Sequence, residues 1–266
     1  MHKVNFMCGM QRSGSTLLSC LLNQNPDVYS SKTSPLLEIV AAIGKSIDYS
    51  LFEFTFDPDS VSKKIIPSTI NSFYQDIDKP IIFDKHRGWL SALHLLDEFY
   101  PNPKILCTVR PVPESITSFF RLIENDNRNI IDKTLREEGK PLTITNRAEC
   151  IMDRIVGPGL NAINNGISYN KDYIHFVEYN ELVSNPQETM DKIYDFLEVP
   201  SFKHNFLDVE NTCKEDKDSN WGMKDLHVIR SCLEKKSTPP EEVLGKELTK
   251  YYSQFNIKYS WTVLNL

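Results

Sequence analysis

The sequence lacks several features that would place it in a large class of proteins. None of its apolar runs approaches the roughly 20 residues that a membrane-spanning helix needs. Basic residues are not in excess, because the net charge is −6, so no overall positive field recruits nucleic acid or an anionic membrane. We therefore expect neither nucleic acid nor a membrane as a partner.

The six cysteines form no Cys-x-x-Cys pair. Cys8 and Cys107 lie in apolar strand-like runs and Cys20 in an apolar helical run, which predicts reduced thiols in a protein core. A disulfide among Cys150, Cys213 and Cys232 stays open. The strand expected at Val4–Cys8 leaves no room for a signal peptide, and we expect a cytoplasmic protein.

Strand-length apolar runs alternate with helical patterns, which predicts an α/β fold with a mostly parallel sheet flanked by helices. The strands are expected at Val4–Cys8, Ile81–Phe83, Lys104–Val109 and Ile174–Glu178. The helices are expected at Thr16–Asn23, Trp89–Phe99, Glu114–Ile123 and Pro186–Leu197. The length favours one domain over residues 1–266, with variable segments at about 46–79 and 124–168.

Two polar stretches interrupt this alternation. Glu124–Asn146 is expected to be a surface excursion or a partly helical lid, with a helix break nearby at Gly157–Gly159. Glu210–Asn220 is expected to be a loop, and the chain after it is basic, with Lys224, Arg230, Lys235 and Lys236 within a few turns.

The stretch MCGMQRSGSTLLSCLL, residues 7–22, almost matches the phosphate-binding loop Gly-x-x-x-x-Gly-Lys-[Ser/Thr]. Gly9 and Gly14 have the required separation, but Ser15 replaces the lysine and Arg12 lies inside the loop. A glycine loop between a strand and a helix is an anion site, because backbone N–H groups and the helix N-terminus converge there. The hydroxyls of Ser13, Ser15 and Thr16 are candidate donors to the anion.

Loss of the lysine changes the expected ligand. In nucleoside triphosphatases that lysine neutralises the terminal phosphates together with Mg²⁺. The planar guanidinium of Arg12 suits a terminal group that carries less charge and needs no metal, and a 5′-phosphosulfate fits this description. We therefore expect no metal site.

The loop QRSGSTL resembles the 5′-phosphosulfate loop of sulfotransferases that use 3′-phosphoadenosine 5′-phosphosulfate (PAPS), whose Golgi-type and bacterial members often carry PRSGTTL. The segment PNPKILCTVRPVPESITSFFR is similar to the 3′-phosphate segment of this family, in which a serine follows a strand-end arginine by eight positions; here these are Arg110 and Ser118. The segment IHFVEYNELVSNPQETMDKIYDFLEVP resembles the late strand and helix of the family. Asn180 stands there for the usual glutamate, and Tyr179 is placed to lie near the adenine.

The resemblance implies a P-loop NTPase-like fold and transfer of a sulfuryl group from PAPS to a hydroxyl or amine, which gives adenosine 3′,5′-bisphosphate. The residues it implies for PAPS are Arg12, Ser13, Gly14, Ser15, Thr16, Arg110 and Ser118. Arg12 and Lys85 are the candidates for stabilising developing charge. His86 is the first candidate for general base, and Glu38 is the second, because Thr33 stands where one branch of the family has its glutamate.

Three questions stay open at this level. A P-loop kinase of small molecules is one alternative function, with Asp84 after a strand as its Mg²⁺ ligand. A sulfotransferase-like module that binds a nucleotide without turnover is another. The acceptor cannot be read from the sequence, although the aromatic residues Tyr49, Phe52, Phe54, Phe56, Phe73 and Tyr74 fall in one variable segment.

Overall fold

The computed structural model describes residues 3–47, 57–100, 102–126, 128–212, 222–233 and 238–258. It contains a five-stranded sheet in the order β2-β3-β1-β4-β5, and each of the four pairings is parallel. The strands are β1 (Lys3–Gly9), β2 (Val28–Thr33), β3 (Ile81–Lys85), β4 (Ile105–Val109) and β5 (Ile174–Glu178). The predicted α/β fold with a parallel sheet is confirmed.

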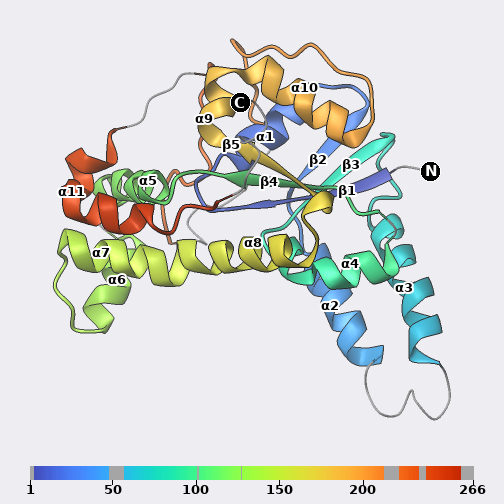
Figure 1. The fold of residues 1–266 in the computed structure, drawn as a ribbon, viewed down its shortest axis with the longest axis horizontal. Coiled ribbons are helices and arrows are strands. Elements are labelled where there is room, and N and C mark those ends of the chain that lie inside the picture. Colours follow the sequence, from blue (N-terminus) through green and yellow to red (C-terminus); the bar gives the residue numbers. More distant parts are fainter. Residues whose placement is uncertain are drawn as a thin grey trace.

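Helices connect the strands and cover both faces of the sheet (Figure 1). They are α1 (Ser15–Leu22), α2 (Leu36–Ile47), α3 (Pro58–Phe73), α4 (Leu93–Phe99), α5 (Val112–Asn125), α6 (Ile130–Glu137), α7 (Ile144–Ile151), α8 (Gly157–Asn170), α9 (Tyr179–Ser184), α10 (Pro186–Leu197) and α11 (Pro240–Ser253). Short 3₁₀ turns, η1 (Trp89–Ala92) and η3 (Lys171–Tyr173), precede α4 and β5, and a π-helical turn, η2 (Met152–Val156), joins α7 to α8. In Figure 1, α1 and α10 lie on one side of the sheet and α4 and α8 on the other.

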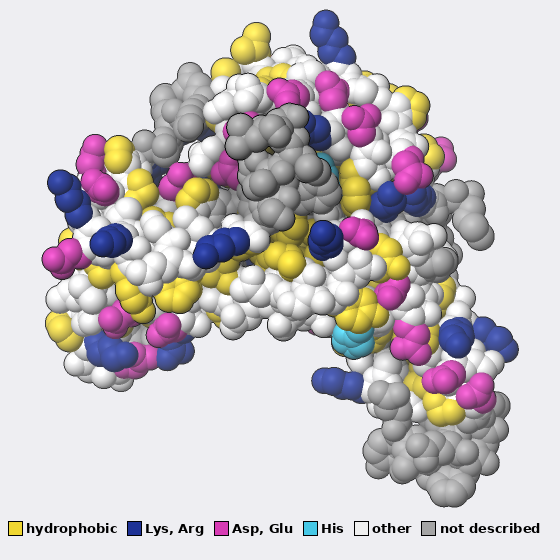
Figure 2. All heavy atoms as spheres, in the orientation of Figure 1, with side chains coloured by type: hydrophobic (Ala, Val, Ile, Leu, Met, Phe, Trp, Pro, Cys, Tyr) yellow, Lys and Arg dark blue, Asp and Glu magenta, His cyan; other side chains and the backbone are white. Residues whose placement is uncertain are grey.

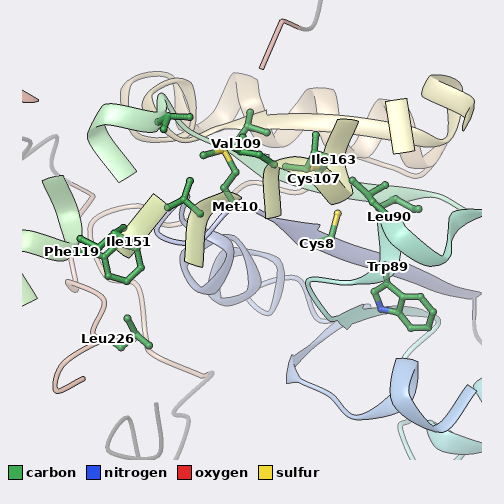
Figure 3. Packing of buried hydrophobic residues seen from close by; sticks show 14 of the residues in the cluster. Cys8, Met10, Trp89, Leu90, Cys107, Val109, Phe119, Ile151, Ile163 and Leu226 are labelled. Carbon is green, nitrogen blue, oxygen red and sulfur yellow. The ribbon is translucent and has the colours of Figure 1, made fainter. Parts of the chain in front are cut away.

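The two faces of β1 show why a parallel sheet needs helices on both sides. Val4, Phe6 and Cys8 belong to a buried cluster that includes residues of α5 and α8, whereas Met7 belongs to a second cluster with residues of α1 and α10. Successive side chains of a strand point to opposite faces, so one strand supplies both clusters. Met10 of the glycine loop and Leu226 of the C-terminal segment also belong to the first cluster (Figure 3).

The sheet order places the carboxyl ends of three strands around the glycine loop. β1 is the central strand, with β3 on one side and β4 on the other, and the register pairs Met7 with Lys85 and Cys8 with Cys107. In open parallel sheets, ligands bind outside the carboxyl ends of the strands. Residues that follow β3 and β4 therefore flank the loop from opposite sides.

Every predicted strand and helix is present, and their bounds differ by at most a few residues from those expected. β2 was not expected, and the stretch predicted as a polar excursion at 124–146 contains α6, whose Ile131 and Leu135 are buried in the core. The predicted break at Gly157–Gly159 is wrong: the chain is helical from Ile144 to Asn170, and Pro158 lies in the first turn of α8, directly after the π-helical turn η2.

Charged side chains of both signs are interspersed on the face shown in Figure 2. Among the described residues, no helix combines the length and hydropathy required to cross a bilayer. Cys8, Cys20, Cys107 and Cys150 are buried free thiols and Cys232 is a partly exposed one, while Cys213 lies outside the described residues. The cytoplasmic location and the single domain stay predictions.

Candidate active site

The glycine loop between β1 and α1 has the backbone of an anion-binding turn. Gly9, Arg12 and Gly14 all have positive φ angles, of 151°, 62° and 89°. A left-handed conformation is easy for glycine and uncommon for other residues, so the loop depends on its two glycines and places Arg12 in a strained position. The turn aims the N-terminus of α1 across the end of β1.

Ser13 holds this loop together from the inside. Its side chain is fully buried, and its hydroxyl lies 2.6 Å from the carbonyl oxygen of Met10 and 2.7 Å from Oγ1 of Thr108 in β4. Of the predicted PAPS-binding residues, Ser13 is the one whose hydroxyl is turned into the protein and does not line the cleft described below. The backbone N–H of Ser13 is therefore its group that can donate a hydrogen bond to a bound anion.

Arg12 connects the loop to two distant segments. Its Nε donates to Oγ of Ser118 in α5 at 3.0 Å, and its Nη1 donates to the carbonyl oxygen of Leu226 in the C-terminal segment. The side chains predicted for the 5′- and 3′-ends of the nucleotide are therefore in direct contact. The contact also ties the C-terminal segment over the loop.

Arg110 follows β4 and is fixed on three sides. Its Nε donates to Glu114 at 3.0 Å, its Nη1 donates to the carbonyl oxygen of Arg12 at 3.2 Å, and its guanidinium lies 4.3 Å from the centre of the Tyr179 ring. Asn180 donates to the other oxygen of Glu114 at 3.2 Å. The residue that departs from the family pattern, Asn180, thus helps to orient the carboxylate that positions Arg110.

Tyr179 also packs against the loop. A Cβ atom added to Gly14 would lie 2.7 Å from Cδ2 of Tyr179, closer than real contacts allow. Gly14 is therefore required both for its φ angle and for the close approach of this ring. The ring lies between the loop and Arg110, at the edge of the predicted nucleotide site.

The β3 side of the loop carries Lys85 and His86. Lys85 is 5% exposed, and its Nζ lies 3.5 Å from Oγ1 of Thr16 at the start of α1. The ring of His86 is held by two contacts: its Nδ1 accepts from the N–H of Gly88 at 3.1 Å, and its Nε2 lies 2.8 Å from Oε1 of Glu38. The structure therefore brings Lys85 to the loop and joins the two candidate bases to each other.

Asp84, the metal ligand that a kinase would require, is sealed in the core. It is fully buried and accepts hydrogen bonds from Ser34, from Tyr74 at 2.5 Å and from Trp89 at 2.6 Å. Burial raises the pKa of this carboxyl, and the three hydrogen bonds partly offset that rise. Because all three partners are buried donors, Asp84 serves to join β3 to the neighbouring helices and does not face a nucleotide.

These residues surround a cleft of about 460 Å³, a volume within the usual range for small-ligand sites. Among the described residues that line it, six are arginines and one, Glu114, carries a carboxylate. The arginines are Arg12, Arg87, Arg110, Arg121, Arg154 and Arg230. A chain with a net charge of −6 thus concentrates positive charge at one place, as expected of a site for a multiply charged anion.

The cleft brings together residues from four parts of the chain. Arg12, Gly14, Ser15, Thr16, Arg110 and Ser118 all line it, and Arg230 joins them from the C-terminal segment. Lys224 does not line it, and Lys235 and Lys236 lie outside the described residues.

Sequence reasoning missed Glu114 and Arg121. Both lie on α5 with Ser118, and both line the cleft. Their spacing was the available signal: Arg121 follows Ser118 by three positions, which places both on one face of α5, and Glu114 follows Arg110 by four.

The fold is of the P-loop-like α/β type, and its cleft is rich in arginine. A model of the sulfotransferase family matches residues 6–204, well over half of the chain. The chain belongs to the sulfotransferase family, and it is an enzyme of that family.

One curated relative is human protein-tyrosine sulfotransferase 1, which is 26% identical over 120 residues. The match covers 42% of this chain and 32% of the relative, so the chain spans about a third of that protein.

Solved structures support the fold. The sulfotransferase domain from the curacin biosynthetic pathway has a TM-score of 0.52 at 18% identity, with 97% of this chain and 93% of that chain covered. The sulfotransferase domain from the Synechococcus PCC 7002 olefin synthase has a TM-score of 0.52 at 20% identity, with 95% and 94% covered. At such identities the likeness concerns the fold and not the substrate.

Proposed function

We propose that this enzyme transfers a sulfuryl group from PAPS to a hydroxyl or amine acceptor and releases adenosine 3′,5′-bisphosphate. One observation carries the proposal: Arg12 in the loop donates to Ser118 while Arg110 donates to the backbone of Arg12. The residues assigned to the two charged ends of PAPS thus form one continuous surface, although they come from segments about a hundred residues apart.

Each part of that surface suits one part of the nucleotide. The loop amides, Ser15, Thr16 and the N-terminus of α1 suit the 5′-phosphosulfate. Arg110 and Ser118 suit the 3′-phosphate, and Arg230 lines the same cleft. An arginine fork offers two parallel hydrogen bonds to a phosphate, which selects a nucleotide with a 3′-phosphate over ATP.

The reaction requires one bond to form and one to break at sulfur. The acceptor oxygen or nitrogen attacks the sulfur, the bond from sulfur to the bridging oxygen breaks, and the electron pair leaves with the 5′-phosphate. Arg12 lies in the loop and Lys85 lies beside it, where positive charge would stabilise the negative charge that develops on that oxygen. Lys85 reaches this position because Met7 and Lys85 are register partners in adjacent strands.

The proton of the acceptor must go to a base, and we propose for this task the pair formed by Glu38 and His86, the residue after Lys85; neither member of the pair lines the cleft in this structure. His86 is 19% exposed and Glu38 is 63% exposed at their side chains. Because Nδ1 of His86 accepts from Gly88, its Nε2 is the nitrogen that carries a proton toward Glu38. The more exposed carboxylate then takes the proton, and His86 orients it.

The kinase alternative is less well supported than it was at the level of the sequence. It needs an acidic strand-end residue for Mg²⁺, and Asp84 is enclosed by three hydrogen-bond donors. An assay would distinguish the proposed enzyme from a sulfotransferase-like module without catalytic activity. Such a module would bind adenosine 3′,5′-bisphosphate without transferring a sulfuryl group to an acceptor.

The decisive test is calorimetric titration of the protein with adenosine 3′,5′-bisphosphate without metal and with ATP plus Mg²⁺. We expect tight binding of the bisphosphate and weak binding of ATP. The reverse order would refute the proposed function.

A further inference from the structure

We propose that Gln11, in the glycine loop, binds the sulfuryl group of PAPS through its side-chain amide and so distinguishes PAPS from adenosine 3′,5′-bisphosphate. The inference rests on the proposed function, because it assigns a further residue to the same reaction. The family loop that this chain resembles, PRSGTTL, has a proline where QRSGSTL has Gln11. The amide is therefore a feature of this chain and not of that pattern.

The side-chain amide of Gln11 has no hydrogen-bond partner within the described part of the chain. Its Oε1 is buried and accepts no hydrogen bond. Its Nε2 also donates to no described residue, but unlike Oε1 it is not enclosed by the protein. Since Gln11 lines the cleft, the two N–H groups of Nε2 are the part of the amide that a ligand in the cleft can reach.

Gly159 of α8 makes room for this amide. A Cβ atom added to Gly159 would lie 2.9 Å from Oε1 of Gln11, closer than real contacts allow. A glycine within a helix lowers stability relative to alanine, and so does a buried oxygen without a donor. Two unfavourable features thus combine to hold one amide at the cleft. This contact gives Gly159 a role other than the helix break that was expected there.

The place of Gln11 in the loop indicates which group its amide meets. Gln11 directly precedes Arg12 and lies three positions before Gly14, after which α1 begins. It reaches the cleft from the side of α8, whereas Ser15 and Thr16 reach it from the start of α1. Under the proposed function the loop holds the 5′-phosphosulfate, so the group of the nucleotide that extends beyond the 5′-phosphate is the sulfuryl group.

A neutral amide suits a group that has to be transferred. The sulfuryl group has three non-bridging oxygens, which share its negative charge and accept hydrogen bonds. Donors that are already aimed at such oxygens stabilise the charge of the transition state. The product nucleotide lacks these oxygens and therefore gains nothing from the amide. Gln11 would thus favour binding of PAPS over retention of adenosine 3′,5′-bisphosphate.

The test compares two nucleotides that differ by the sulfuryl group, PAPS and adenosine 3′,5′-bisphosphate. Calorimetry measures the binding of each in the absence of an acceptor. Gln11→Leu removes the amide at a similar side-chain volume. It should weaken binding of PAPS by about tenfold and leave the affinity for the bisphosphate within about twofold. The melting temperature of the free variant should not fall, because the lost oxygen has no partner.

A second variant displaces the amide without removing it. Gly159→Ala places a methyl group against Oε1 of Gln11, so it should lower the ratio of the two affinities by more than about twofold. The same substitution in a Gln11→Ala background should leave the ratio unchanged, because the methyl group then meets no amide. Gln254→Leu is the matched control, since Gln254 is exposed after α11 and does not line the cleft. It should change neither affinity.

Four results would overturn the inference. They are an unchanged affinity for PAPS in Gln11→Leu, an equal loss for both nucleotides, a lower melting temperature of that variant, and an effect of Gly159→Ala that persists without Gln11. Failure of the unmodified protein to bind the bisphosphate would instead refute the proposed function. The two failures are told apart because binding of the bisphosphate is measured first.

Discussion

The imidazole of His86 is hydrogen bonded to the carboxylate of Glu38, with 2.8 Å between Nε2 and Oε1. The sequence presents these residues as two competing candidates for the general base, separated by almost fifty positions. The structure shows that they are in contact, because the N–H of Ser34, just before α2, donates to the carbonyl oxygen of Lys85 at the end of β3 at 3.0 Å. A single proton acceptor built from two residues has measurable consequences.

The first prediction concerns this pair. His86→Asn and Glu38→Gln should each lower kcat by about 10²-fold, the lower end of what a general base contributes. Because the two act as a unit, the double variant should cost about as much as either single variant. Affinity for adenosine 3′,5′-bisphosphate should not change. Losses that multiply in the double variant, or a kcat equal to that of the wild type, would contradict the assignment.

The second prediction concerns the 3′-phosphate. Arg110→Ala should weaken binding of adenosine 3′,5′-bisphosphate by about 1.5–3 kcal/mol, since it removes a charge-assisted hydrogen bond. Arg136→Ala serves as the control, because Arg136 is exposed on α6 and does not line the cleft. Calorimetry compares the two variants. An unchanged affinity in Arg110→Ala would refute the role given to Arg110.

The third prediction separates two neighbouring serines of the loop. Ser13→Ala removes a buried hydroxyl that contacts Met10 and Thr108, so it should lower the free energy of unfolding by about 1–3 kcal/mol. Ser15→Ala removes a hydroxyl that lines the cleft, so it should lower nucleotide affinity and leave stability nearly unchanged. Urea unfolding and calorimetry measure the two effects. The opposite pattern would mean that the roles are exchanged.

The fourth prediction concerns the contact between Gly14 and Tyr179. Gly14→Ala should destabilise the protein by more than the roughly 1 kcal/mol of a left-handed alanine, because the new methyl group would also meet the Tyr179 ring at 2.7 Å. Gly139→Ala is the matched control, since Gly139 has a φ angle of 68° and no atom within 4 Å of an added Cβ. Equal losses of melting temperature in the two variants would exclude the steric part of this explanation.

The fifth prediction concerns pH. Burial lowers the pKa of His204 from 6.5 to about 4, and its ring packs against Tyr194, with 3.0 Å between Nε2 and the phenol oxygen. The unfolded chain takes up a proton below about pH 6.5 and the folded chain does so only near pH 4, so stability falls as the pH drops through this window. The loss attributed to His204 is on the order of 2–3 kcal/mol. Urea unfolding between pH 7.5 and 4 should show it. Burial also lowers the pKa of His175 to about 4, so His204→Gln should remove only part of the fall in stability. An identical profile in the variant would show that His204 does not contribute.

Much of the fold follows from local patterns. β1, β4 and β5 are short apolar runs next to turn residues, and α10 begins at Pro186 and ends at Leu197 as its periodicity predicts. The glycine loop, Arg110 and Ser118 were recognisable because they resemble segments of the family in which these residues keep short, fixed spacings. β2 was missed because VYSSKT ends in two exposed polar residues, Lys32 and Thr33, and looks like a turn. Its hydrogen-bonded pairing with β3 makes it a strand.

The sequence by itself determined the alternation of strands and helices, the glycine loop after β1 and the spacing of Arg110 and Ser118, because each depends on residues within about ten positions of one another. Only the tertiary structure decided which of these groups meet. It turned Ser13 inward, enclosed Asp84, joined His86 to Glu38 and laid Leu226 over Arg12. Such contacts depend on the strand order and on how helices pack across the carboxyl edge of the sheet, and both are set by burial summed over the whole chain.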